Sequence, residues 1–180
     1  MHLDRVACPW LIRRFIDHDA EFIFVQWGQE DSRPGDAIPF AIPGVELGVA
    51  DGEESTFDKI MRKYRLNDRS LAFMARVLGS GIHRSLHKGM ADEYQVPLLD
   101  GIGLESISQG MMLTTDGDLD NLDKSMAIYD ALYAYCSVQV AKSDDLSIAT
   151  KSIWDISTLI KPKIKEILSR KVEASRISAD

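Results

Sequence analysis

The chain has 180 residues, of which 45% are apolar and 27% are charged, and its formal net charge is -7. This length and composition fit one well-packed globular core, alone or with an appendage. The acidic balance argues against a general binder of nucleic acid or of anionic membranes, because both need a basic surface. Only Cys8 and Cys136 are present, without CxxC spacing, so we expect neither a disulfide framework nor a structural zinc site.

The first residues contain no long apolar segment, and no stretch of about 18 apolar residues follows. These patterns predict neither a signal peptide nor membrane insertion. We therefore expect a cytoplasmic protein.

The motif at residues 4–17, DRVACPWLIRRFID, combines a cysteine and a tryptophan with arginines. Pro9 suits the first position of a helix, which would make Cys8 the N-cap. A thiol there faces free backbone N–H groups and the positive end of the helix dipole, and both favour the thiolate. Arg5 and Arg13 would add positive charge. The alternative interpretation is that Cys8 is an ordinary buried core residue.

Three short segments after this helix have the composition of β-strands. Residues 21–27 are rich in aromatic and β-branched side chains, and residues 38–42 and 45–49 are shorter candidates. Pro39 would restrict the second segment to a sheet edge or a bulge. We therefore expect an α+β fold that is mostly helical, with a small N-terminal β-sheet.

Apolar spacing predicts helices in the rest of the chain. Ser55 or Thr56 is expected to cap a helix that ends at Asn67-Asp68, and a second helix is expected to stop at Gly79-Ser80-Gly81. Residues 103–113 form a predicted short helix, and a longer one runs from Asp118 or Asp120 to Val140 or Ala141. The expected core residues are Trp10, Leu11, Phe15, Phe22, Phe24, Phe57, Ile60, Phe73, Val77, Met126, Tyr129 and Leu132.

A polar segment at 143–147 separates the chain into a predicted domain, residues 1–142, and a C-terminal helical extension, residues 143–180. The extension has helical apolar spacing with basic residues on its polar side, and Pro162 is expected to start a new helix or kink this one. An amphipathic helix of this kind docks on its own core, pairs with a second subunit or lies on a membrane surface. Docking or a homodimer through these C-terminal helices is the preferred interpretation.

Two groups of residues are candidate metal ligands. His83 and His87 are four residues apart, so on a helix they share one face and can hold one divalent ion with further ligands from elsewhere. The carboxylates of residues 51–54, Glu54 among them, suit a hard cation, although a solvated loop is the simpler interpretation.

Asp130 lies among apolar and aromatic residues of the predicted helix that includes Tyr129 and Tyr133. If Asp130 faces inward, its carboxylate needs a cationic partner, which Arg5, Arg13 or Arg14 can supply. The alternative is that Asp130 lies on the solvated side of an amphipathic helix.

The motifs at residues 4–17, 20–25, 42–47, 55–58 and 126–136 resemble those of the bacterial chromate-resistance family, the ChrB-like domain. The similarity extends from residue 4 to about residue 136. It implies a cytoplasmic domain associated with chromate resistance and proposed to sense or regulate. It does not by itself imply a reaction mechanism.

Three functions stay open from the sequence. The first is an accessory or sensor domain that binds a small oxyanion such as chromate, or a metal. Its candidate ligand-binding residues are Arg5, Cys8, Arg13, Arg14, Glu54 and Asp130. The second is a redox enzyme that uses a thiol or a divalent metal, so the sequence leaves catalysis undecided; no flavin or nicotinamide motif is present. The third is a module of a transcriptional regulator, although the acidic charge makes DNA an improbable partner for this domain alone.

Overall fold

The computed structural model describes residues 3–49, 54–87 and 98–171. Its helices are α1 (Asp4–Phe15), α2 (Thr56–Lys63), α3 (Arg69–His87), α4 (Leu99–Leu113), α5 (Asp118–Asp144), α6 (Leu146–Ala149) and α7 (Ile153–Ser169), with one 3-10 turn, η1 (Glu30–Ser32). The predicted α+β class is wrong for this part of the chain, which is helical and contains no strand.

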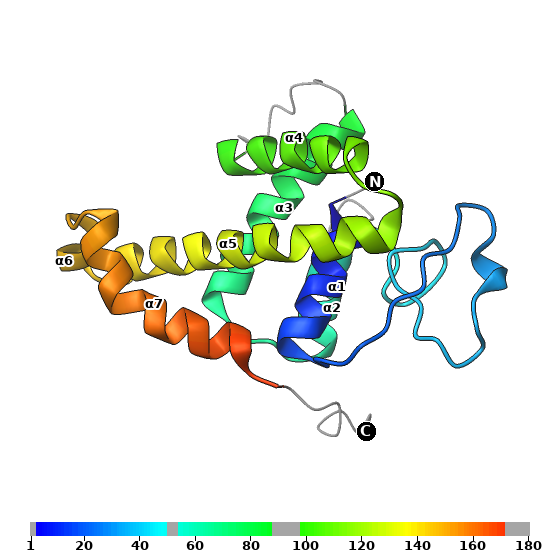
Figure 1. The fold of residues 1–180 in the computed structure, drawn as a ribbon, viewed down its shortest axis with the longest axis horizontal. Helices are drawn as coiled ribbons and strands as arrows, with labels where there is room; N and C mark the ends of the chain where they lie inside the picture. The colour runs from blue at the N-terminus through cyan, green and yellow to red at the C-terminus, as the bar shows by residue number, and fades with distance from the viewer. Residues whose placement is uncertain (1–2, 50–53, 88–97, 172–180) are drawn as a thin grey trace.

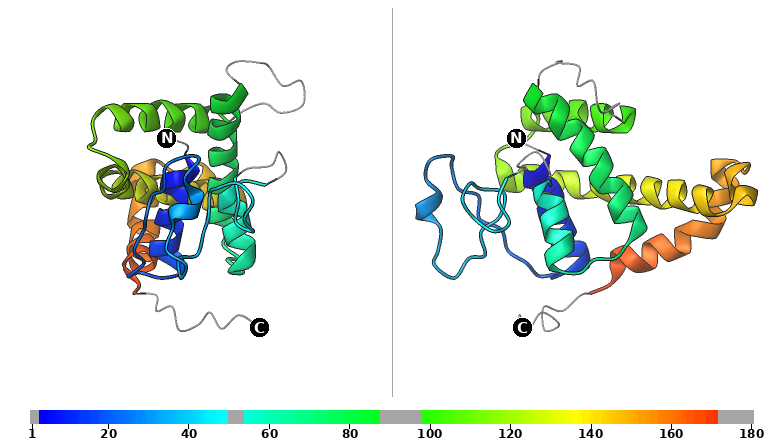
Figure 2. Two further views of the ribbon diagram at one scale, coloured as in Figure 1. Left: turned by 90° about the vertical axis from the view of Figure 1, so that its right-hand side faces the viewer. Right: turned by 180° about the vertical axis from the view of Figure 1, so that it is seen from behind.

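Helix α5 is the central element of the fold (Figure 1). It packs against α1 and α3, while α2 lies against α1 and α4 packs on α3. After the short α6, α7 folds back from the end of α5 and contacts α5 and α1, as the view from behind in Figure 2 also shows. The core lies where α1, α2, α3 and α5 meet. Its largest fully buried side chains include Trp10, Tyr133, Phe57, Leu11 and Ile60.

Half of the predicted core residues are buried in the structure. Trp10, Leu11, Phe57, Ile60, Val77 and Tyr129 are buried. The other expected members are partly buried and pack against this cluster: Phe15, Phe22, Phe24, Phe73, Met126 and Leu132.

Contrary to prediction, residues 16–49 between α1 and α2 form no sheet. An isolated bridge between Phe40 and Leu47 is the one β-type pairing among the described residues. A proline within or next to a strand removes a ladder hydrogen bond, and two short paired segments are only marginally stable alone. The aromatic side chains instead contact α1 and one another: the Arg5 and Arg13 guanidinium groups lie over the rings of Phe24 and Phe22, and Phe22 packs edge-on against Phe40.

The prediction that α1 begins at Pro9 is also wrong. The helix begins at Asp4, with Leu3 at the N-cap position, and Pro9 lies inside it. Leu3 and Val6 are buried in the core, so the additional turn buries apolar surface. This burial offsets the cost of an interior proline.

Two further predicted breaks lie inside continuous helices. α3 continues through Gly79 and Gly81 to His87, and α7 continues through Pro162. Gly81 serves packing: a Cβ atom there would lie 2.7 Å from the Gly101 carbonyl oxygen of α4. Gly81 and Gly101 therefore let α3 and α4 cross closely, whereas a Cβ atom at Gly79 would meet no atom within 4 Å. Two predicted helix starts are confirmed: Ser55 forms a capping box with Asp58 at α2, and Asp68 accepts hydrogen bonds from the first N–H groups of α3. α2 ends at Lys63, earlier than the predicted end at Asn67-Asp68.

Candidate functional site

The arginines of α1 pair with aspartates along α5. Arg5 Nη2 lies 3.1 Å from an oxygen of Asp118, and Arg13 Nη1 lies 3.2 Å from an oxygen of Asp123. Arg5 also donates to the Val25 carbonyl, and Arg13 to the Ala20 carbonyl. These contacts neutralise the charge of two arginines that the sequence proposed as anion ligands.

Arg14 and Asp130 form the most buried of these ion pairs. Arg14 Nε and Nη2 donate to the two carboxylate oxygens of Asp130 at 2.9 and 2.8 Å. Trp10 Nε1 donates to the same carboxylate at 2.8 Å. Asp130 therefore faces inward, and Arg14 is its cationic partner. A carboxylate occupied by three donors ties α1 to α5 and has little capacity left for a ligand.

Cys8 is fully buried and lies in the middle of α1. Burial, followed by the negative charges of Asp4 and Asp58, raises the pKa of the Cys8 thiol well above its usual range. The N-cap position predicted for Cys8 is wrong, and the environment favours the neutral thiol over the thiolate.

The structure describes only part of the predicted metal ligands, so the metal site stays a prediction. His83 is half-buried on α3, and the side chain of His87 lies outside the described residues, as do residues 51–53. Glu54 forms an ion pair with Arg62 at 2.8 Å. No group of three or more His, Cys, Asp or Glu side chains in metal-binding geometry occurs among the residues described.

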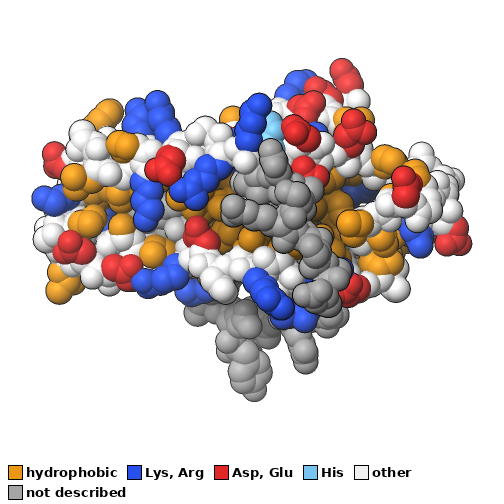
Figure 3. Space-filling view, turned by 90° about the horizontal axis from the view of Figure 1, so that it is seen from below, with side chains coloured by type: hydrophobic (Ala, Val, Ile, Leu, Met, Phe, Trp, Pro, Cys, Tyr) orange, Lys and Arg blue, Asp and Glu red, His pale blue; other side chains and the backbone are white. Residues whose placement is uncertain are grey.

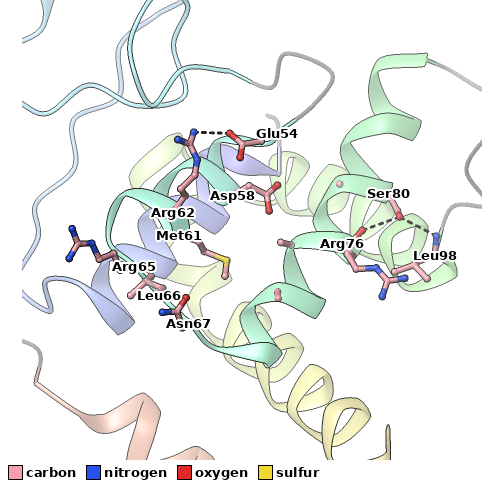
Figure 4. A pocket seen from close by; sticks show the side chains of 13 residues that line it. Glu54, Asp58, Met61, Arg62, Arg65, Leu66, Asn67, Arg76, Ser80 and Leu98 are labelled. Atoms are coloured by element: carbon pink, nitrogen blue, oxygen red, sulfur yellow. Dashed lines mark hydrogen bonds and ion pairs between the residues drawn. The ribbon is translucent and has the colours of Figure 1, made fainter.

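A cleft between α2 and α3 brings Glu54 together with residues that the sequence did not indicate as ligands (Figure 4). Its volume is about 830 Å³. The residues that line it are Glu54, Asp58, Met61, Arg62, Arg65, Leu66, Asn67, Ala72, Ala75, Arg76, Gly79, Ser80 and Leu98. We call it the α2–α3 cleft.

Two arginines of the α2–α3 cleft have no carboxylate partner among the described residues. Arg62 pairs with Glu54, whereas Arg65 and Arg76 form no ion pair within the described ranges. The Arg76 guanidinium lies 5.7 Å from the centre of the Phe73 ring. In Figure 4, Arg76 stands beside Ser80 and Leu98 on the α3 side, and Arg65 lies at the opposite end. The cleft therefore has an excess of positive charge.

Arg65 occupies a backbone position that normally favours glycine. It follows the C-cap of α2 with a φ of 51°. Arg65 N–H donates to the Arg62 carbonyl and Leu66 N–H to the Met61 carbonyl, a Schellman motif. An arginine in the left-handed region costs about 1 kcal/mol relative to glycine. Such strain is common at functional positions.

The sequence held only a weak signal for this cleft. Arg62 and Arg65 lie three positions apart near the end of a predicted helix, where the helix dipole ordinarily favours basic residues. Arg76 comes from another helix. Only the packing angle of α2 and α3 brings the three arginines to one cleft.

The comparisons with known proteins concern most of the chain. The family model described as "ChrB, C-terminal domain" matches residues 1–136. "Protein ChrB" from Cupriavidus metallidurans (strain CH34) is 33% identical over 138 residues, which make up 75% of this chain and 38% of that relative. The chain thus spans well under half the length of this relative. No solved structure matches. The family resemblance indicated by the motifs is confirmed.

No helix among the described residues has the length and apolarity to cross a membrane.

Proposed function

This chain belongs to the family of the ChrB C-terminal domain, and we propose that it serves chromate resistance by binding a tetrahedral oxyanion, chromate or an isostere, in the α2–α3 cleft. The observation that carries the proposal is the pair of arginines, Arg65 and Arg76, that have no carboxylate partner among the described residues. Family membership links the chain to chromate resistance, and the cleft supplies the chemistry for an anion.

Arginine suits this ligand because its planar guanidinium donates several N–H groups to the oxygens of a dianion. Arg65 and Arg76 line the cleft from its opposite ends, and each side chain is long enough to turn inward. The Ser80 hydroxyl on the α3 side donates to the Arg76 carbonyl at 3.0 Å and accepts from Leu98 N–H at 3.1 Å, so the arginines are the donors for the anion. The α1 arginines are poorer candidates, since each already binds an aspartate of α5.

Calorimetric titration of the purified chain with chromate and with redox-inert sulfate tests this proposal. We expect both anions to bind, more weakly at high ionic strength. Arg76→Gln and Arg65→Gly should each weaken binding by about tenfold, which corresponds to the loss of one charge-assisted hydrogen bond of about 1.4 kcal/mol.

Arg65→Gly is the sharper variant, because it removes the charge while relieving the positive φ. It should bind less anion and yet unfold at a higher denaturant concentration. Arg13→Gln is the matched control, since Arg13 pairs with the exposed Asp123 outside the cleft. The proposal is wrong if neither anion binds, or if Arg13→Gln weakens binding as much as Arg76→Gln.

The chromate absorption band distinguishes an enzyme that reduces chromate from a domain that only binds it. Loss of the chromate absorption band in the presence of a thiol reductant, at a rate proportional to protein concentration, would favour the redox enzyme. An unchanged band together with saturable binding supports the sensor or accessory role.

A further inference from the structure

A second, larger cavity lies between the helical body and residues 16–49. Its volume is about 880 Å³, within the range of small-molecule sites. The segment that covers it projects from the helices on the side away from α6 (Figures 1 and 2). Long connections without regular structure are often binding loops.

The segment is held over the helices by aromatic contacts. The Arg5 and Arg13 guanidinium groups lie 5.4 and 5.1 Å from the ring centres of Phe24 and Phe22. Phe22 packs edge-on against Phe40 with ring centres 6.1 Å apart. In Figure 3, hydrophobic side chains are visible on the right half of the face, where this segment lies.

The cavity wall is mainly apolar and aromatic. On the body side it is lined by Ile12 of α1, by Ile16 at the C-cap of α1, by Tyr64 beyond α2 and by Ile82 of α3; aromatic residues such as Phe24 line the other side. A wall of this kind suits a flat apolar ring.

One buried polar group also lines the cavity. Asp4 is 6% exposed, and its Oδ2 accepts a hydrogen bond from Thr56 N–H at 3.3 Å. Its Oδ1 is buried and has no hydrogen-bond partner among the residues the structure describes. A buried carboxylate oxygen without a donor is costly, and a ligand donor would remove that cost.

The charges around the cavity exclude an anion. Its acidic lining residues outnumber its two arginines, and Arg5 is already paired with Asp118. The acidic residues are Asp4, Asp17, Glu21, Glu30 and Asp36. The cavity therefore differs in ligand class from the α2–α3 cleft.

We propose that this cavity binds a small aromatic amine, with its ring between α1 and the aromatic residues of segment 16–49 and its ammonium group donating to Asp4 Oδ1. The proposal is independent of the oxyanion function, because it uses other residues and the opposite ligand charge.

Three probes with one ring system test the charge preference in the full chain: tryptamine, indole and indole-3-acetate. In a calorimetric titration near pH 7.5 we expect tryptamine to bind at least tenfold more tightly than indole. Indole-3-acetate should bind more weakly than either. The proposal is overturned if tryptamine does not bind at millimolar concentration, or if the anion binds as well as the amine.

Two variants locate the site. Asp4→Asn should lower tryptamine affinity by about tenfold and leave indole binding unchanged. Ala37→Phe adds a ring to the cavity wall and should abolish binding of both probes. The matched control is Ala127→Phe on the exposed face of α5, which should change nothing. Binding of tryptamine that survives both cavity variants would also overturn the proposal. Sulfate titration of the same variants reports separately on the α2–α3 cleft.

Discussion

Arg14 and Asp130 join α1 to α5 through two parallel hydrogen bonds of 2.9 and 2.8 Å, although 116 positions separate them in the chain. Arg14 Nη1 also points to the carbonyl of Leu168 at 3.5 Å, so the same guanidinium reaches the end of α7. Side chains of the pair are 21% and 25% exposed. This arrangement places a partly desolvated ion pair where three helices meet.

Removing the Asp130 carboxylate should therefore destabilise the fold. We expect Asp130→Asn to lower the free energy of unfolding by about 2 kcal/mol, because Arg14 is left partly buried without its counter-charge. Asp123→Asn is the matched control on the same helix, since Asp123 is 71% exposed and its pair with Arg13 is solvated. Its effect should be about 0.5 kcal/mol. Urea unfolding of both variants measures the difference, and equal effects would contradict this account.

Because both cysteines are buried, we expect neither thiol of the native protein to react with alkylating reagents. Cys8 and Cys136 are fully buried, and burial raises the pKa of the Cys136 thiol to about 12. At pH 7.5 iodoacetamide should label neither thiol in the native chain and both after unfolding, because the reactive thiolate is scarce and shielded. Ala127→Cys, at an exposed position of α5, is the positive control and should react at once. Rapid labelling of native Cys8 would restore the exposed-thiolate interpretation of the N-terminal motif.

Two glycines of α4 should respond oppositely to alanine. A Cβ atom at Gly101 would clash with the Val77 carbonyl oxygen of α3, whereas one at Gly103 would meet no atom within 4 Å. Gly101→Ala should lower stability by about 1 to 3 kcal/mol through forced separation of the helices. Gly103→Ala should raise it by about 0.5 to 1 kcal/mol through helix propensity. Thermal unfolding midpoints that move in the same direction would contradict the close crossing.

Asp4 should make stability depend on pH. Burial raises its pKa from 3.8 to about 6 in the folded chain, so the folded state holds the proton more tightly than the unfolded state. Between about pH 4 and pH 6 the folded state binds more protons, and stability therefore falls as the pH rises through this window. The full penalty is about 3 kcal/mol near pH 7.

Asp4→Asn removes this ionisation. The variant should be more stable than the parent near pH 7 by about 2 kcal/mol, and the difference should shrink toward pH 4. Denaturant unfolding at both pH values measures it. A difference that grows on acidification would show that Asp4 is stabilised as the carboxylate.

The homodimer expected from the C-terminal helices stays a prediction, and exposed side chains allow a sharp test. Leu146, Ile153, Trp154 and Leu159 are 83%, 58%, 80% and 59% exposed. Figure 3 shows hydrophobic and basic side chains side by side at the left end, where α6 and α7 lie. Sedimentation should report a dimer that Trp154→Glu converts to a monomer. Ile156→Val, within the buried face of α7, is the control and should leave the dimer intact. A monomeric parent chain would contradict the prediction.

Local pattern determined much of the helical structure. Apolar spacing located α2, α5 and the centre of the core, and short-range side-chain hydrogen bonds at Ser55 and Asp68 set two helix starts. The family could also be identified from the motifs, and the family match confirms it. These features depend on residues close in sequence, which a single sequence displays directly.

Tertiary packing decided the rest. Burial of Leu3 and Val6 favours a start of α1 before Pro9, and the close crossing with α4 favours the continuation of α3 through Gly81. The Phe22 ring packs against the Arg13 guanidinium of α1 instead of pairing in a sheet. Each outcome depends on atoms distant in sequence, whose approach no local spacing encodes. For the same reason aspartates of α5 neutralise Arg13 and Arg14, while Arg65 and Arg76 line one cleft that only the packing of α2 against α3 creates.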